Sequence, residues 1–421
     1  MGRRSKVLVH RRGRAKSVPA IICVVGMLLA GCSSSHSGTV SGGTTGTTSP
    51  AGGTGSLTGA PIEVGSIMAA SGPLGDPLFT TAANAWVKWT NAHGGINGHP
   101  VHLTLLDDSG NATTSLSEVK QLIQQNHVMA IIGSNSPVAV SWASYIDQVK
   151  VPVIGGTSAF FPGEGPYFFP AALGAVEAAP ISVQLAGRIR AKKLAWLYSA
   201  GFGNPSGMTQ LASAAHLPLY QSEVSLTAPD YTAPCLSLKS SGADLVSVAS
   251  SGTVLATIAK TCIQNGYTGA FLAPGNAEPS WSKDSQLSKA RIYSIDYTWP
   301  FQDQTTPEQA SYFQALKTYA PGALSSPAYN VYVQILWAGM QMFAAAAKAA
   351  HIGPSSTPAD LIDGLYGLHN ETLGGLIGPI TYNRADANHA DGCYFISEFH
   401  NGQWTDPFGA QGQCIANPTS G

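Results

Sequence analysis

Several residues of this chain could take part in catalysis, but their spacing completes no catalytic set. Asp107 and Asp108 could form the carboxylate pair of a hydrolase; alternatively, one caps the following segment and the other is solvated. The run Gly155–Ala159 contains a serine but lacks the Gly-x-Ser-x-Gly pattern that exposes a nucleophile at a sharp turn. No Gly-x-x-x-x-Gly-Lys-Ser/Thr sequence is present to hold a nucleotide phosphate. We therefore expect a protein that is not an enzyme and does not hydrolyse ATP itself.

Residues that ligate metals also lack a recognisable spacing. His93, His99 and His102 lie close together in the sequence, but no His-x-x-x-His pair occurs, and a loop followed by a polar strand face explains them. His389 and Cys393 could suggest a metal site, although the segment 383–391 is simply polar. We expect neither a metal nor a cofactor.

The first 31 residues have the order of a secretory signal peptide. Seven Lys and Arg precede position 32 with no Asp or Glu among them, and the segment 17–31 is uncharged and largely apolar. At about 1.5 Å per residue this segment spans roughly 22 Å, which is short of the ~30 Å hydrocarbon core of a bilayer. A cleavable signal peptide is therefore favoured over a membrane-spanning helix.

The signal segment ends in Leu29-Ala-Gly-Cys32, which resembles the bacterial lipobox. The resemblance implies lipidation of the Cys32 sulfur and cleavage before it; the alternative is an ordinary signal peptide with a chance cysteine. Residues 33–60 contain 22 Ser, Gly or Thr among 28 residues and no charge. Such a stretch stays a flexible coil of roughly 30 Å. We expect residues 32–60 to be a tether between the lipid and a folded body.

Four cysteines remain in the expected mature body: Cys235, Cys262, Cys393 and Cys414. An even number in an exported chain suggests two disulfides, for which three pairings are possible. We expect the sequence-near pairing, Cys235 with Cys262 and Cys393 with Cys414. A zinc site is the alternative, but no Cys-x-x-Cys spacing occurs.

The length and the charge of the chain limit the classes of protein to which its folded body can belong. The 421 residues are enough for two domains with real cores, and 44% of them are hydrophobic against 11% charged. Without the seven N-terminal cations, 15 Lys and Arg stand against 23 Asp and Glu, a net charge of −8. Nucleic-acid binding depends on clustered Lys and Arg, so we expect no nucleic-acid partner. The most apolar later window, 331–350, is interrupted by Gln334, Gln341 and Lys348, so we expect no second membrane crossing.

From residue 61 onward, strand and helix patterns alternate, which predicts parallel, doubly wound α/β sheets. Two such runs are separated by the 160–174 loop, which indicates two similar lobes rather than one long sheet. The expected strands are 62–69, 101–106, 128–132, 152–154, 194–198, 221–226, 243–249 and 270–273, with helices between them. Past residue 296 we expect helices 307–319, 327–350 and 358–366 and then strands 379–382 and 393–399.

The chain therefore returns to the first lobe and then to the second, through several crossovers at a hinge. We expect an N-terminal lobe of residues 61–173 plus 298–390 and a C-terminal lobe of residues 174–297 plus 391–421. Two lobes that face each other across the carboxyl ends of their strands would enclose a ligand cleft.

Ten short motifs occur in a fixed order along the body. They are Gly65–Leu74, Asn91–Gly98, Leu103–Asp108, Ile131–Ser134, Val151–Ser158, Leu197–Gly203, Asp230-Tyr231, Leu238–Asp244, Gly378–Ile380 and Asn401–Trp404. This ordered set resembles the leucine/isoleucine/valine-type (branched-chain amino-acid) substrate-binding proteins of ABC transporters, which have the type I periplasmic-binding clamshell fold. The resemblance covers residues 61–405 and lies in the order of the motifs rather than in one of them.

On the first lobe the resemblance implies a ligand site in three loops. These are the 71–77 loop with Leu74, the loop with Ser134 and Ser136, and the loop with Gly156, Thr157 and Ser158. Backbone N–H groups and hydroxyls at a helix N-terminus suit a carboxylate. The alternative is that Ser134 or Ser136 merely caps the helix that follows.

On the second lobe the resemblance implies contacts from Phe202, Ser251 and Asn276, with core packing as the alternative role of Phe202. The family commonly has an acidic residue that meets a ligand ammonium, but Thr227-Ala-Pro229 occupies that place here. Asp230 is the nearest carboxylate, and it looks like a helix cap. We therefore expect a small organic acid, amide or weakly cationic solute with an apolar part, ahead of leucine, isoleucine or valine.

These observations predict a lipid-anchored solute-binding protein on the outer face of the cell membrane. It would capture a small molecule, an amino acid or related organic acid or amide, and deliver it to a membrane ABC permease and its ATPase. One alternative is a sensor or adhesion lipoprotein with the same clamshell and no transport role. A third hypothesis is that the protein is an exported enzyme.

Overall fold

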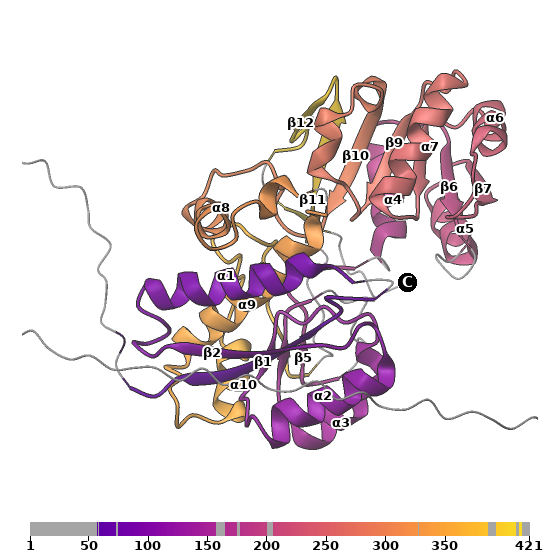
Figure 1. Ribbon diagram of the computed structural model, residues 1–421. Helices are drawn as coiled ribbons and strands as arrows, with labels where there is room; N and C mark the ends of the chain where they lie inside the picture. Colours follow the sequence, from indigo (N-terminus) through magenta and orange to yellow (C-terminus); the bar gives the residue numbers. More distant parts are fainter. Residues whose placement is uncertain are drawn as a thin grey trace, which may run out of the picture. The chain divides into compact units, whose positions relative to one another are not determined.

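The computed structural model describes residues 57, 59–72, 75–156, 165–174, 177–199, 205–326, 328–385, 393–409 and 412–414. Within them the chain forms two β-sheets, each with helices on both faces (Figure 1). In the described part of the chain, no helix is long and apolar enough to cross a membrane.

The first sheet is entirely parallel, with strand order β2-β1-β3-β4-β5. Alternate residues of its short inner strands enter different cores: Ile131 and Val153 join the core under α2 and α3, whereas Ile132 and Ile154 join the core under α1. A parallel strand that is buried on both faces has a continuous run of apolar residues, and such a run can be recognised in the sequence. The elements are β1 (Ile62–Met68), α1 (Pro77–Ala92), β2 (Val101–Asp107), α2 (Ala112–Gln124), β3 (Ile131–Ile132), α3 (Ala143–Val149), β4 (Val153–Ile154) and β5 (Phe168–Phe169).

The second sheet has eight strands in the order β12-β11-β10-β9-β8-β6-β7, with β13 paired to β11. Helix α4 packs on one face and helices α6 and α7 on the other. Its elements are α4 (Ala178–Arg188), β6 (Leu194–Tyr198), α5 (Pro205–Ala214), β7 (Leu219–Glu223), α6 (Thr232–Ser241), β8 (Leu245–Val248), α7 (Gly252–Gln264), β9 (Ala270–Pro274), β10 (Arg291–Asp296), β11 (Cys393–His400), β12 (Gln403–Thr405) and β13 (Gln413–Cys414).

This sheet is not purely parallel, contrary to the expectation. Strand β11 runs antiparallel to β10, with Arg291 opposite His400, and β12 runs antiparallel to β11. Asn401 and Gly402 join β11 to β12 with φ angles of 53° and 77°. Such positive angles suit a tight hairpin turn, which Asn-Gly adopts readily. A direct hairpin therefore forms where a helical crossover would otherwise be required.

Among the described residues between β10 and β11 are three α-helices: α8 (Pro307–Tyr319), α9 (Val331–Ala349) and α10 (Pro358–Tyr366). The bounds of α8 and α10 agree with the sequence prediction, and both begin with a capping box, on Thr306 and Thr357. Helix α9 passes so close to the first sheet that a Cβ on Gly339 would lie 2.6 Å from the Cα of Gly155. The predicted strand at 379–382 is not formed. Only an isolated bridge joins Ile380 to Glu371, next to a proline that has no N–H to donate.

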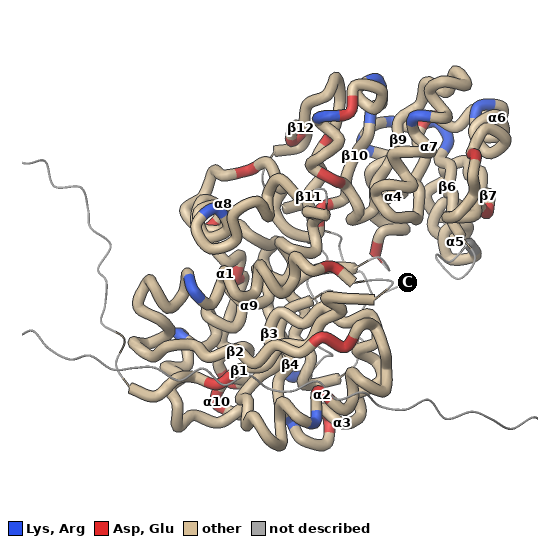
Figure 2. Tube along the Cα trace, viewed as in Figure 1, with Lys and Arg blue, Asp and Glu red and all other residues tan. Residues whose placement is uncertain are grey.

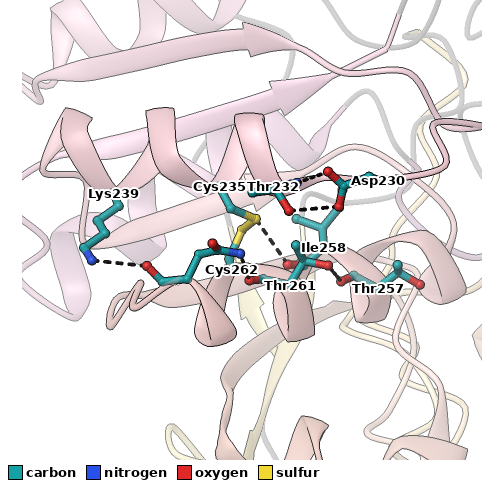
Figure 3. The surroundings of a disulfide bond; sticks show 9 residues. Asp230, Thr232, Cys235, Lys239, Thr257, Ile258, Thr261 and Cys262 are labelled. Carbon is teal, nitrogen blue, oxygen red and sulfur yellow. Dashed lines mark hydrogen bonds between the residues drawn. A yellow bond between two sulfur atoms is a disulfide. The ribbon is translucent and has the colours of Figure 1, made fainter.

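Two disulfides occur with the predicted pairing. Cys235 of α6 is bonded to Cys262 of α7 with a Cα–Cα distance of 4.7 Å (Figure 3). Cys393 of β11 is bonded to Cys414 of β13 with a Cα–Cα distance of 3.8 Å. The first disulfide is fully buried beneath the two helices. It closes a loop of 27 residues and the second closes one of 21.

Candidate functional site

A cavity of about 430 Å³ lies where the loops leave the carboxyl ends of β8 and β9, beside Trp196 of β6 and Leu226, which follows β7. Ligands of open α/β sheets bind at this edge, and the volume falls in the range of small-molecule sites. Its apolar wall consists of Ala178, Trp196, Leu226, Ala249 and Pro274. Its polar groups belong to Ser250, Ser251, Asn276, Glu278, Asn330 and Tyr332.

Two glycines allow the chain segments beside this cavity to approach each other closely. A Cβ on Gly252 would overlap the carbonyl oxygen of Asn276, so the loop after β8 touches the loop after β9. Gly275 has φ +73°, and a Cβ there would overlap the ring of Tyr297. Both positions require a residue without a side chain. The close approach fixes Ser251 and Asn276 at one rim of the cavity.

Ser251 and Asn276, which the sequence predicted as ligand contacts, both line the cavity. The hydroxyl oxygen of Ser251 caps α7 by accepting from the Val254 N–H at 3.4 Å. The side-chain amide of Asn276 donates to the carbonyl oxygen of Ser250. Its Oδ1 is buried with no hydrogen-bond partner among the described residues. A buried acceptor of this kind costs free energy until a donor reaches it.

Glu278 is the charged residue that the sequence reasoning missed. Its Oε1 accepts from the Thr253 hydroxyl at 3.1 Å and its Oε2 from the Ser280 hydroxyl at 3.4 Å. It is the only charged side chain among the cavity's lining residues in the described part of the chain. The available signal was its position two residues after Asn276, in the loop that ends β9.

Two buried aromatic side chains near the cavity also have polar atoms without partners in the described structure. They are the indole N–H of Trp196, which is 4% exposed, and the hydroxyl of Tyr297, which is 2% exposed. Burial raises the pKa of Tyr297 well above its usual range, and the neighbouring Tyr332, Glu177 and Asp296 raise it further. Tyr297 is therefore a neutral phenol at physiological pH.

The predicted serines after β3 are held inside the protein. The Ser134 hydroxyl donates to the carbonyl oxygen of Ile67 at 2.8 Å, and the Ser136 hydroxyl donates to Asp108. The Ser136 oxygen also accepts from the Val138 N–H at 3.3 Å, a contact of the capping kind. Both side chains are 1% exposed. Only their oxygen lone pairs remain for a ligand, so their role in binding stays a prediction.

The carboxylates of Asp107 and Asp108 support loops. Asp107 accepts from the N–H groups of Ala70, Ser71 and Ser109 at 2.9–3.2 Å. Burial alone would raise the pKa of Asp107, but these hydrogen bonds and one from the Ser71 hydroxyl lower it. Asp108 is fully buried and accepts from the Gly110 N–H at 2.9 Å. Asn111 caps α2, so the expectation that one of the two aspartates caps the following segment is wrong.

The loop at 71–77 ends at Asp76, which caps α1 by accepting from the Leu78 N–H at 2.8 Å. Its second oxygen accepts from the side-chain amide of Asn330 at 2.8 Å. Burial raises the pKa of Asp76, although both hydrogen bonds oppose the rise. Because Asn330 lines the cavity, this bond joins the predicted loop to the cavity wall.

Asp230 does not line the cavity. Its carboxylate is exposed and accepts from the N–H and the hydroxyl of Thr232 at 3.2 and 2.9 Å, at the start of α6 (Figure 3).

The predicted Gly156 follows β4 with φ +74° and is buried. Of the other predicted positions, Cys32, Leu74, Thr157, Ser158 and Phe202 lie outside the described residues.

The described residues contain no group of three His, Cys, Asp or Glu that could hold a metal ion. The residues that line the cavity provide hydrogen-bonding groups, one carboxylate and apolar surface. These groups suit the binding and orientation of a small molecule.

Residues 61–403 match the family described as Periplasmic binding protein. The chain belongs to this family. No curated protein sequence matches this periplasmic binding protein. The family match confirms the resemblance seen in the motifs.

Solved structures confirm the type I periplasmic-binding fold. A branched-chain amino-acid ABC transporter protein of Thermus thermophilus with bound valine is 14% identical, with a TM-score of 0.72 over 85% of this chain and 97% of that one. An ABC transporter substrate-binding protein of Aeropyrum pernix is 18% identical, with a TM-score of 0.70 over 86% and 98%. The branched-chain amino-acid substrate-binding protein LivJ of Streptococcus pneumoniae with isoleucine is 15% identical, with a TM-score of 0.65 over 84% and 100%.

Proposed function

We propose that this solute-binding protein captures an amino acid or a related organic acid or amide and delivers it to an ABC importer. The cavity at the carboxyl edge of the second sheet carries this proposal, because it presents an Asn276 oxygen that no described residue pairs, beside apolar surface. A ligand that donates to Asn276 and covers Trp196 and Leu226 would satisfy both. Valine and isoleucine, which the titles of two similar structures name, have the corresponding size and apolar part.

The proposed binding mode is closure of two lobes around the ligand. The lobes are residues 61–173 with 298–390 and residues 174–297 with 391–421. The hydrogen bond between Asp76 and Asn330 supports a link between the first-lobe loop and the cavity. Ser134, Ser136 and Gly156 lie at the carboxyl edge of the first sheet, from which a second set of contacts would come.

The proposed location is the outer face of the cell membrane. Cleavage before Cys32 and lipidation of its sulfur would anchor the chain in the bilayer, and residues 32–60 would tether the folded body. The partners would be a membrane permease and its ATPase, since this sequence has no phosphate-binding loop of its own. A sensor or adhesion lipoprotein with the same binding site is the alternative. Loss of solute uptake in a strain that lacks this protein would favour transport.

The experiment that tests the proposal is native mass spectrometry of the exported full chain, followed by calorimetry with the compound that it carries. Replacing Asn276 by Ala should weaken binding about tenfold, because a buried hydrogen bond to the ligand is lost. The matched control is Asn84→Ala, on the exposed side of α1. The proposal would fail if no small molecule bound, or if both variants bound it equally well.

A further inference from the structure

A second cavity, of about 350 Å³, lies at the amino edge of the second sheet, opposite the edge that carries the solute cavity. Its walls include the two turns that follow α4 and α5 and lead into the neighbouring parallel strands β6 and β7. The Leu194 N–H donates to the carbonyl oxygen of Pro218 at 2.9 Å and joins these turns. The lining includes three basic residues and an apolar wall, namely Arg190, Lys192, His216, Val183, Leu217 and Pro218. None of the described residues that line this amino-edge cavity is acidic.

The ends of α4 and α5 do not depend on these basic side chains. Cations often occur at the C-terminal end of a helix because they offset its exposed carbonyl groups. Here backbone N–H groups already pair with carbonyls at both ends. The Ala191 N–H donates to the Ala186 oxygen at 2.8 Å after α4, and the Leu217 N–H donates to the Ala212 oxygen at 2.9 Å after α5. Helix capping therefore leaves the basic side chains available for another role.

The side chains of Arg190, Lys192 and His216 are exposed and form no hydrogen bond or ion pair with other described residues. The carboxylate of Asp244 lies beside this turn but accepts from the backbone. Its two oxygens accept from the Lys192 N–H at 3.0 and 2.9 Å, and one of them also accepts from the Lys193 N–H at 3.0 Å. Asp244 thus fixes the backbone of the turn, and the Lys192 ammonium remains open to an anion from solution.

The charges of this part of the chain are separated between the two edges of the sheet. Residues 174–297 contain nine Lys and Arg against seven Asp and Glu, whereas the rest of residues 61–421 contains six against sixteen. Five of the seven acidic residues lie at strand ends or helix starts on the carboxyl edge, namely Glu177, Glu223, Asp230, Glu278 and Asp296. Figure 2 shows the Lys and Arg segments of this sheet around the labels β12, β9 and α6. This distribution attracts an anion to the amino edge and repels it from the rest of the body.

From this arrangement we infer that the amino-edge cavity binds a phosphate monoester, with Arg190, Lys192 and His216 as its donors. A phosphate monoester carries close to two negative charges at neutral pH and three terminal oxygens. Two of these oxygens match the planar fork of an arginine, and the third is left for the lysine and the histidine. A carboxylate, with one charge and two oxygens, would leave a donor without a partner. The cavity is larger than a phosphate ion, so Val183 and Leu217 would contact the organic part of the ester.

The test is titration calorimetry of the full chain with phenyl phosphate, benzoate and phenol, which share a ring and differ in charge. Phenyl phosphate should bind at least about tenfold more tightly than the other two. The double variant Arg190→Gln/Lys192→Gln should lose at least about tenfold in affinity for phenyl phosphate. Arg190→Lys, which keeps the charge but not the fork, should lose less.

The matched control is Lys283→Gln/Lys289→Gln, which removes two exposed charges from the same part of the chain outside the cavity and should change the affinity less than about twofold. Thermal unfolding without probes checks that the variants fold. Asn276→Ala should leave the binding of phenyl phosphate unchanged, which separates this site from the solute cavity. A phosphodiester with a lipid headgroup, dihexanoylphosphatidylglycerol as dissolved monomer, should bind more weakly than phenyl phosphate.

The inference is overturned if phenyl phosphate binds no more tightly than benzoate, or if both double variants lose affinity equally. It is also overturned if Asn276→Ala abolishes the binding while Arg190→Gln/Lys192→Gln does not. Tighter binding of the phosphodiester would assign the cavity to a lipid headgroup instead. None of these results bears on the capture of a solute at the carboxyl edge, so the two proposals fail separately.

Discussion

Two buried carboxyl groups beside β10 and β11, those of Asp296 and Asp303, make the free energy of unfolding depend on pH. Asp303 is 8% exposed, and burial raises its pKa to about 7, with the hydrogen bond and charge of Asp406 and the charge of Asp296 adding to the rise. Burial also raises the pKa of Asp296 to about 6, although hydrogen bonds from Ser294 and Ser397 oppose it. In the folded chain these groups therefore take up protons more readily than an ordinary Asp.

The sign of the effect follows from the raised pKa values. The free energy of unfolding gains its full contribution from these groups below about pH 4 and loses it as the pH rises through about 6 and 7. At about 1.4 kcal/mol per pKa unit, the rise for Asp303 from 3.8 to about 7 corresponds to roughly 4 kcal/mol. Because part of this change falls below pH 5, we expect roughly half of it, about 2 kcal/mol, between about pH 5 and about pH 8.

The assay is urea unfolding of the full chain at intervals over this pH range. Asp303→Asn keeps a neutral side chain at every pH, so it should flatten the dependence and be more stable than the parent by about 2 kcal/mol near pH 8. The matched control is Asp284→Asn. The hydrogen bond from Lys260 lowers the pKa of Asp284, so this variant should be less stable by the same amount across the range. A parent protein whose stability does not change with pH, or an Asp303→Asn variant that keeps the full slope, would refute the reasoning.

Three other changes have defined outcomes. Cys32→Ala should release the chain from membranes or leave the leader uncut, as fractionation and mass spectrometry would show; a membrane-bound variant with its leader removed would contradict the lipid anchor. Replacing Cys235 and Cys262 by Ala should lower the free energy of unfolding by about 3 kcal/mol, since a loop of 27 residues is opened; non-reducing peptide mapping that finds free thiols in the exported parent would contradict the pairing. Gly339→Ala should lower the midpoint of thermal unfolding, because its Cβ would press on Gly155; an unchanged midpoint would show that α9 can move away at no cost.

Much of the fold could be predicted because parallel strands buried on both faces are continuous apolar runs. Strands β6 and β9 were found in this way. Strand β10 was missed because its sequence contains Arg291, Ser294 and Asp296, although five of its six residues are buried. The burial of Ser294 and Asp296 depends on β11, whose residues are far along the chain, and local patterns cannot reveal such a partner.

The candidate site was predicted in part for a similar reason. Ser251 and Asn276 follow predicted strands, and the carboxyl ends of parallel strands share one edge. Asp230 also follows a strand, but its local bonds to Thr232 hold it away from the cavity. Glu278 was overlooked because only the contact between Gly252 and the loop after β9 brings that side chain to the rim.

The pairing of β10 with β11 has a consequence for biosynthesis. Arg291 of β10 lies opposite His400 of β11, so β10 can form this pairing only after about a hundred further residues have been synthesised. Until then, an emerging chain presents β10 as an unpaired edge, the kind of surface on which chains aggregate. Completion of the second sheet, and with it the bond between Cys393 and Cys414, must follow synthesis of Cys414. Until then the second sheet stays incompletely folded, which is the state in which a polypeptide can pass through a narrow translocation channel.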